Sequence, residues 1–147
     1  MQILRTLALL GLSLAAYAQI RAQPEVVEVR AVVDGHTLAA GGRRVRLAGI
    51  RAPRPDRGTN DAEPFGREAR ERLEGIVIHR FVRLEFPAGA TGSAAYVLLE
   101  DGTFVNALLV REGLARVAGR LPGARGDELQ RAQASAQAAR RGIWRVP

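Results

Sequence analysis

The sequence predicts a small β-barrel of the α+β class, and three observations lead to this prediction. The chain has 147 residues, 47% of them apolar, which suits one globular domain with its own core. Short β-branched runs separated by Asp-Gly and Gly-Gly turns fill its first part, and helical signals dominate the C-terminal part. The chain contains no cysteine, which excludes disulfide frameworks, zinc ribbons and thiol catalysis.

The first segment, residues 1–18, has the pattern of a secretory signal peptide. Arg5 supplies a positive region, Leu7–Ala16 is an apolar run, and Ala16-Tyr17-Ala18 places small residues at the two positions that a signal peptidase reads. We expect cleavage after Ala18, leaving residues 19–147 as a single domain that is secreted or periplasmic. The run is shorter than the about 20 apolar residues of a membrane span, so no stable anchor is expected; an uncleaved anchor is the alternative.

The next elements are predicted strands. Val26–Val33 is β-branched and ends at the Asp34-Gly35 turn, after which Thr37–Ala40 can form the returning strand. Gly41-Gly42 then turns the chain into a strand over Arg43–Ile50.

A polar loop over Pro53–Asp61 separates these strands from the first predicted helix. Pro64 suits the first helical position, the helix runs to about Leu73, and Gly75 is its expected stop. The following pairs have i,i+4 spacing and indicate a salt-bridged helix face rather than a binding surface: Arg67–Glu71, Glu68–Arg72 and Arg70–Glu74.

The remaining elements are two strand regions and two helices. Val82, Leu84 and Phe86 alternate on one strand face, and a hairpin at Asp101-Gly102 would join residues 94–100 to 103–105. The first of the two predicted helices is capped by Asn106 and closed by Gly113. The second is capped by Asp127, and Gln130 completes a capping box. The apolar stripe of the second helix consists of Leu129, Ala132, Ala136 and Ala139.

The basic residues indicate an anionic partner. All 22 of them are arginine, against 15 acidic residues, and the net charge is +7. Guanidinium is always charged and binds phosphate oxygens in two-pronged fashion. A coding bias that favours arginine is the alternative explanation.

Several segments, in order and spacing, resemble the staphylococcal nuclease (thermonuclease) family over nearly all of residues 26–144. They are Val32–Leu38, Val45–Pro53, Pro64–Ala69, Ala95–Gly102, Val105-Asn106, Leu109–Ala115 and Gly142–Trp144. The resemblance implies an OB-fold with a five-stranded barrel and three helices. It also implies calcium-dependent cleavage of DNA and RNA, with two metal-binding aspartates, a glutamate that activates water and two arginines that hold the phosphate.

The matched positions depart from the family at four of the five catalytic residues. His36 stands at the first metal aspartate, Arg51 at the second, Arg54 at the glutamate and Gly92 at the second arginine, so that Arg46 is the one retained residue. Three arginines replace a site with net negative charge, and nearby cations should keep His36 neutral. We therefore expect no calcium cofactor and no family-type calcium catalysis, but an anion site at Arg46, Arg51 and Arg54.

Simpler interpretations of these residues stay open. Asp34 and His36 can be turn residues, Arg51 and Arg54 can be solvated loop arginines, and Arg43-Arg44 beside the glycine turn is expected to be solvated. His36 is far in the sequence from the other histidine, and one histidine does not make a zinc site, which needs three or four ligands.

Three functions follow from these residues. The first is an exported, non-hydrolytic module that binds nucleic acid or another polyanion electrostatically and without sequence specificity. The second is a working phosphodiesterase, with metal ligands relocated to Asp56, Asp61 or Glu63 or with a metal-free mechanism. The third is a protein-interaction or envelope-structural domain.

Overall fold

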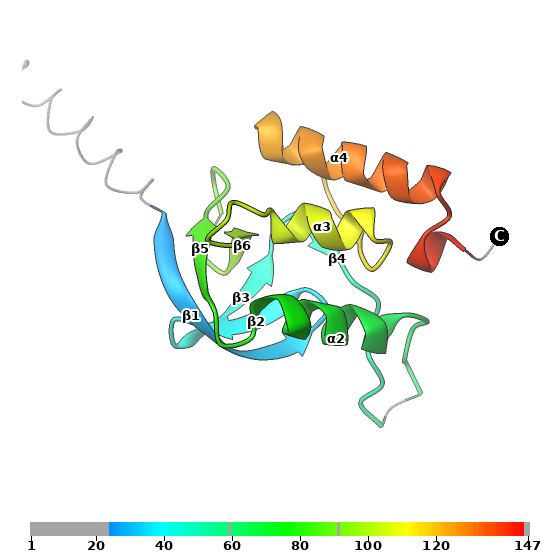
Figure 1. Cartoon of the computed structure of the whole chain (residues 1–147), viewed down its shortest axis with the longest axis horizontal. Coiled ribbons are helices and arrows are strands. Elements are labelled where there is room, and N and C mark those ends of the chain that lie inside the picture. Colours follow the sequence, from blue (N-terminus) through cyan, green and yellow to red (C-terminus); the bar gives the residue numbers. More distant parts are fainter. Residues whose placement is uncertain (1–23, 59, 91, 146–147) are drawn as a thin grey trace, which may run out of the picture.

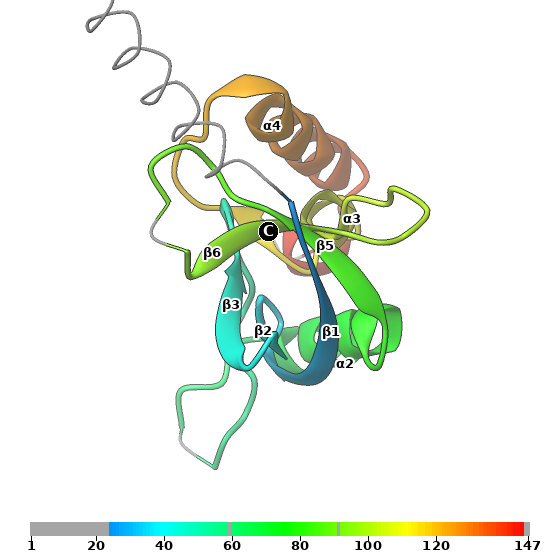
Figure 2. The ribbon, with the colours of Figure 1, turned by 90° about the vertical axis from the view of Figure 1, so that its left-hand side faces the viewer.

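The computed structural model describes residues 24–58, 60–90 and 92–145, so the expected signal peptide lies outside the described residues. Within them, five strands form a closed barrel in the order β1-β2-β3-β6-β5, and three helices lie on one side of it (Figures 1 and 2). This architecture confirms the predicted α+β barrel. The strands are β1 (Glu25–Asp34), β2 (Thr37–Ala40), β3 (Arg43–Leu47), β5 (Phe81–Glu85) and β6 (Ala94–Leu98).

Side-chain alternation explains how β3 builds one wall of the barrel. Val45 and Leu47 point into the core, whereas the arginines between and before them are exposed. β3 pairs antiparallel with β2 and parallel with β6, where Arg46 lies opposite Ala94. The outward face of β3 is therefore basic.

The strand predicted over residues 43–50 is interrupted, because Gly49 adopts a left-handed conformation with φ of 74°. A Cβ atom at this glycine would lie 2.6 Å from a methyl carbon of Leu121, so a larger residue does not fit without repacking. After the turn, β4 (Ile50–Arg51) leaves the barrel and pairs with β7 (Arg116–Val117) in a separate two-stranded sheet. Neighbouring stretches of one predicted strand thus belong to two sheets.

The first helix, α2 (Gly66–Val77), begins and ends later than predicted. Pro64 lies in the preceding turn and Gly75 lies inside the helix, so neither has its expected role. Apolar residues on one face, Ala69, Leu73, Ile76 and Val77, are buried and hold the helix against the barrel despite the glycine.

One of the three predicted salt bridges on α2 is present. Arg67 lies 3.9 Å from Glu71, but Arg72 instead makes a two-pronged pair with Glu112, at 2.7 and 2.8 Å. Arg70 donates to the carbonyl oxygen of Val32, with an N–O distance of 3.5 Å. Arg70 and Arg72 thus contact residues distant in the sequence instead of their expected i,i+4 partners on the helix.

The hairpin predicted at Asp101-Gly102 is formed only in part. The turn is present, and Leu98 and Phe104 form an isolated antiparallel bridge, but no strand covers residues 103–105 because α3 begins as Val105–Arg111. Asn106 does not cap this helix: it is fully buried, accepts from the Val97 amide at 2.9 Å and donates to the Ala48 carbonyl at 2.9 Å. Its amide joins the end of β3, β6 and α3.

The last helix, α4 (Gly123–Ala138), begins four residues before the predicted cap, so Asp127 lies within it and no capping box forms. The buried stripe is confirmed for Leu129, Ala132 and Ala136, whereas Ala139 follows the helix and is exposed. Within the described part of the chain, no helix has the length and apolar character needed to cross a membrane.

Candidate functional site

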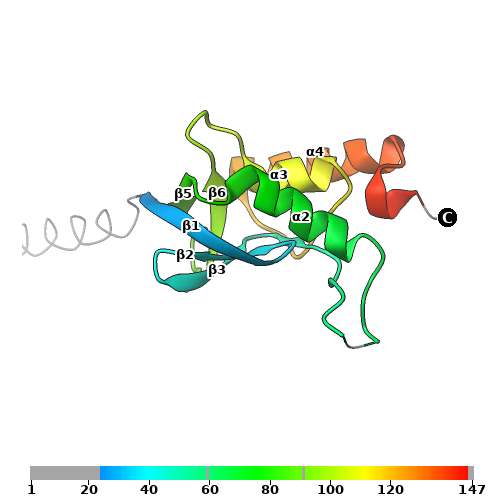
Figure 3. The ribbon, with the colours of Figure 1, turned by 60° about the horizontal axis from the view of Figure 1, so that its bottom comes forward.

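The residues singled out from the sequence converge at one edge of the barrel, where the β1–β2 turn meets β4 and the following loop. Figure 3 shows this loop extending away from the body of the molecule between β4 and α2. Arg46 lies on β3, Arg51 on β4 and Arg54 in the loop, and the side chains of the last two are 53% and 56% exposed. The predicted cationic cluster is therefore accessible to solvent.

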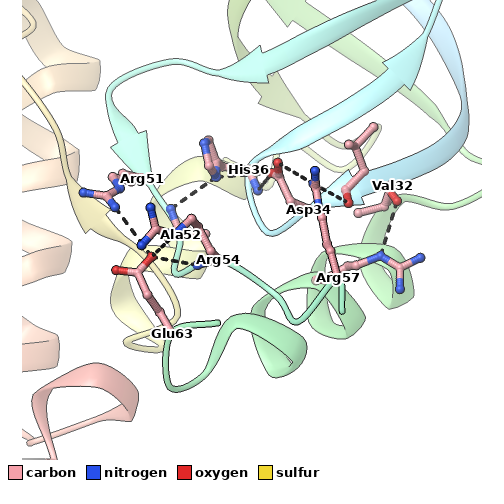
Figure 4. Close-up of polar contacts among 10 residues, drawn as sticks. Val32, Asp34, His36, Arg51, Ala52, Arg54, Arg57 and Glu63 are labelled. Atoms are coloured by element: carbon pink, nitrogen blue, oxygen red, sulfur yellow. Dashed lines mark hydrogen bonds and ion pairs between the residues drawn. The ribbon is translucent and has the colours of Figure 1, made fainter. Parts of the chain in front are cut away.

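Glu63 is the internal partner of two of these arginines (Figure 4). Its Oε2 atom lies 3.5 Å from Nη2 of Arg51 and 3.5 Å from Nε of Arg54, and it also accepts a 2.9 Å hydrogen bond from the Arg54 amide. The Glu63 amide donates back to the Arg54 carbonyl at 2.9 Å. Arg51 and Arg54 are thus not freely solvated: both guanidinium groups contact Glu63, and Nε of Arg54 also donates to the Asp61 carbonyl at 3.2 Å.

Asp34 has the structural role that a turn residue would have. Its Oδ1 atom accepts a 3.0 Å hydrogen bond from the His36 amide, which closes the turn between β1 and β2. Its Oδ2 atom lies 3.5 Å from Nη2 of Arg57, a loop arginine that the sequence analysis did not select. These three residues line a cleft of about 210 Å³ together with Pro53, Arg54, Pro55 and Asp61.

His36 lies between an amide donor and a carboxylate. It is 15% exposed, and its Nδ1 atom lies 3.3 Å from the Ala52 amide nitrogen and 3.2 Å from Oδ1 of Asp34. The first contact suits a neutral ring that accepts at Nδ1, and the second suits a ring that carries a proton there. Burial lowers the pKa of His36, Asp34 raises it in part, and Arg46 and Arg51 lower it further. A lowered pKa agrees in direction with the expectation that His36 is neutral, but burial is a larger cause of the lowering than the nearby arginines.

Gly92 directly precedes the residue that bonds to the backbone of Arg46. The Arg46 amide donates a 2.7 Å hydrogen bond to the carbonyl of Ser93, the next residue after Gly92. A Cβ atom at Gly92 would meet no atom within 4 Å. The position therefore opens onto free space next to the retained arginine and supplies no charge.

Arg116 is a site residue that the sequence analysis missed. It lies directly opposite Arg51 in the β4–β7 pair, and both line a cleft of about 40 Å³ with Ala52, Pro53 and Glu63. A strand of two residues has no alternation to detect, so no sequence signal connects Arg116 to the site.

Arg43 and Asp56, two further residues considered in the sequence analysis, have partners in the structure. Arg43 is not merely solvated, because it makes a two-pronged pair with Glu25 at 2.6 and 2.9 Å. Asp56 accepts from the Gly58 amide at 2.8 Å. Across residues 24–58, 60–90 and 92–145, no three or more histidine, cysteine or carboxylate side chains gather where they could hold a metal ion.

The fold and the comparisons now define the class of this protein. A closed five-stranded barrel with three helices is the architecture of staphylococcal-nuclease-like proteins, and a family model described as staphylococcal nuclease homologue matches residues 44–146. The chain is also 28% identical over 132 residues to a thermonuclease of Staphylococcus hyicus, covering 84% of this chain and 78% of that relative. The chain belongs to the staphylococcal nuclease homologue family.

Proposed function

We propose that this protein is an exported, non-hydrolytic member of its family that binds nucleic acid or another polyanion through charge. The observation that carries the proposal is that Arg51 and Arg54 both lie 3.5 Å from the Glu63 carboxylate, while Arg51 and the barrel arginine Arg46 both act on His36 through charge. The family pattern has acids at two of these three positions. The exported location rests on the signal-peptide pattern of residues 1–18.

The side chains of the site do not fit a calcium ion. Calcium takes six to eight oxygen ligands, and guanidinium groups have no lone pair to offer. Two unit charges about 6 Å apart repel by roughly 3 kcal/mol at an effective dielectric constant near 20, and a divalent cation would meet twice that from each arginine. Glu63 is engaged by Arg51 and Arg54, and Asp34 by the His36 amide and Arg57.

The same side chains suit phosphate. Exposed guanidinium groups can offer paired donors to phosphate oxygens, and the excess of arginine over acid at the site favours an incoming anion. Aromatic residues make up only 5% of the chain, so stacking platforms for bases are scarce. Binding should therefore be non-specific in sequence and should weaken steeply with salt.

The test is the affinity of the full chain for labelled DNA, RNA and polyphosphate at low and at physiological salt. We expect binding at low salt, and we expect Arg51→Ala with Arg54→Ala to weaken it about tenfold or more. The matched control removes the same charge at Arg30 and Arg67, whose side chains are 74% and 78% exposed. No affinity at low salt, or equal losses in both double variants, would show the proposal to be wrong.

A cleavage assay with calcium, magnesium and a chelator tests the non-hydrolytic part. We expect no turnover by the unmodified chain. Combining His36→Asp, Arg51→Asp and Arg54→Glu restores the acidic pattern of the family, but only weak activity is expected because Gly92 still lacks the second arginine. Turnover by the unmodified chain that the chelator abolishes would contradict the proposal.

A further inference from the structure

The β4–β7 sheet places two arginines side by side at the edge of the candidate site. Arg51 and Arg116 are direct partners in this antiparallel pair. Side chains at opposed positions lie on the same face, with Cβ atoms about 4.5–5.5 Å apart, and like charges there are unfavourable. Both residues are exposed, so an anion from solvent can reach them and relieve the repulsion.

The cleft that these arginines line is small. Its volume is about 40 Å³, whereas one water requires about 10–15 Å³, so it has room for about three water-sized groups. That is enough for the oxygens on one side of a phosphate whose remainder stays in solvent. Glu63 is the acidic residue among the described lining residues, 3.5 Å from Nη2 of Arg51. Two guanidinium groups against one carboxylate leave this cleft with a positive balance.

Arg116 is held in place more firmly than an ordinary surface arginine. Its guanidinium carbon lies 5.6 Å from the centre of the Trp144 ring, within the range of a cation–π contact. The next residue, Val117, donates its amide to Oε1 of Gln133 on α4 at 2.7 Å. A positioned guanidinium loses less conformational freedom when a ligand binds, which favours affinity.

From this arrangement we propose that Arg116 and Arg51 form a two-arginine clamp for one phosphate group of the ligand. The inference rests on the proposed function and extends it, because it assigns the second cationic arm of the site to a residue of β7. Gly92 supplies no side chain for that purpose. Each guanidinium would donate to phosphate oxygens from one side of the cleft.

Trp144 offers a direct readout, because it is the one tryptophan of the chain and its ring contacts Arg116. The full chain is titrated separately with pyrophosphate and with a single-stranded DNA 12-mer while tryptophan fluorescence and affinity are recorded. We expect a saturable fluorescence change with both probes. If the fluorescence changes with only one of the two probes, the clamp binds that source of phosphate, either free pyrophosphate or the DNA backbone.

Substitutions at Arg116 separate charge from geometry. We expect Arg116→Ala to abolish the fluorescence change and weaken binding about tenfold or more, because a charged contact with the phosphate is lost. Arg116→Lys keeps the charge but loses the two-pronged contact, so we expect a smaller loss of about threefold. Arg131→Ala removes one exposed arginine of α4 and serves as the control, with a change of less than about twofold.

The two proposals fail in different ways. If Arg51→Ala and Arg54→Ala weaken binding but Arg116→Ala and Arg116→Lys do not, the clamp is wrong and the proposed function stands. If the unmodified chain binds neither probe at low salt, the proposed function itself is wrong. Circular dichroism establishes that each variant is folded, and if Arg116→Ala is not, Arg116→Lys decides the outcome.

Discussion

Glu63 determines how much of the positive charge at the site is available. It contacts Arg51 and Arg54 through the same oxygen, where an external phosphate oxygen would bind. An incoming phosphate must therefore compete with a carboxylate that the chain itself supplies. Glu63 thus holds both guanidinium groups within the chain itself.

The first prediction concerns this internal carboxylate. Glu63→Gln keeps an oxygen for the Arg54 amide but removes the negative charge, so affinity for polyphosphate should rise about three- to tenfold at low salt. Titration with labelled polyphosphate measures this. The control Glu100→Gln makes the same charge change in the exposed turn after β6 and should have little effect. An equal rise in both variants would attribute the gain to net charge alone.

The second prediction concerns the pH dependence that His36 brings to stability. Its pKa is lowered in the folded protein from the ordinary 6.5, so the unfolded chain binds the proton first as pH falls. Stability from this group is therefore present above about pH 6.5 and is lost as pH falls through 6.5 toward the folded pKa. Each unit of lowering corresponds to about 1.4 kcal/mol.

Denaturant unfolding between pH 7.5 and pH 5 checks this expectation. His36→Gln should show a shallower loss of unfolding free energy over this window than the unmodified chain. Parallel pH profiles for the two proteins would contradict the assignment of a buried, neutral histidine.

At the scale of elements, the loop that carries Arg54 is fitted closely onto the first turn of α2. A Cβ atom at Gly66 would overlap the carbonyl group of Arg54 and lie 2.7 Å from the Pro55 nitrogen. Because these are backbone atoms, no side chain can swing aside to make room. The start of α2 thus sets where the loop, and with it Arg54, is placed.

The third prediction compares two glycines of this one helix. Gly66→Ala should destabilise the fold by about 1–3 kcal/mol and weaken polyanion binding, because the loop must move away from α2. Gly75→Ala meets no atom within 4 Å and should stabilise the helix by about 0.5–1 kcal/mol without altering binding. Thermal unfolding and polyanion titration of both variants measure the contrast. Equal effects at the two positions would contradict the close fit of the loop.

At the scale of the whole molecule, the surplus of positive charge should make stability depend on polyanions. A ligand that binds the folded state alone adds about 2.7 kcal/mol at 100 times its Kd. As a fourth prediction, polyphosphate at that concentration should raise the Tm by several degrees at low salt, and the shift should shrink as salt is added. Differential scanning calorimetry measures the Tm shift. An unchanged Tm would favour the alternative function as a protein-interaction domain.

Sequence reasoning succeeded where local pattern decides structure. The Gly41-Gly42 turn predicted that a strand begins at Arg43, and β3 begins there, with Val45 and Leu47 inward and the arginines outward. It failed where a tertiary partner outweighs local preference: Asn106 has the chemistry of a helix cap but is recruited to bond Val97 and Ala48 in the core.

The same division holds for the candidate site. Arg46, Arg51 and Arg54 could be selected because they stand at recognisable positions of a family pattern. The pairing of Arg51 with Glu63 depends on how the loop folds back, and its proximity to Arg116 depends on a strand 65 positions later in the chain. No local signal encodes either contact.

The separation of β4 from the barrel bears on the order in which the protein matures. All five barrel strands lie within residues 25–98, whereas β7, the partner of β4, begins at Arg116. A chain that emerges from a ribosome or a translocation pore with its N-terminus first can therefore close the barrel while β4 still has an unpaired edge. Arg51 and Arg116 can pair only after residues 116–117 have emerged, so a chain truncated before β7 would lack one side of the cleft that both arginines line.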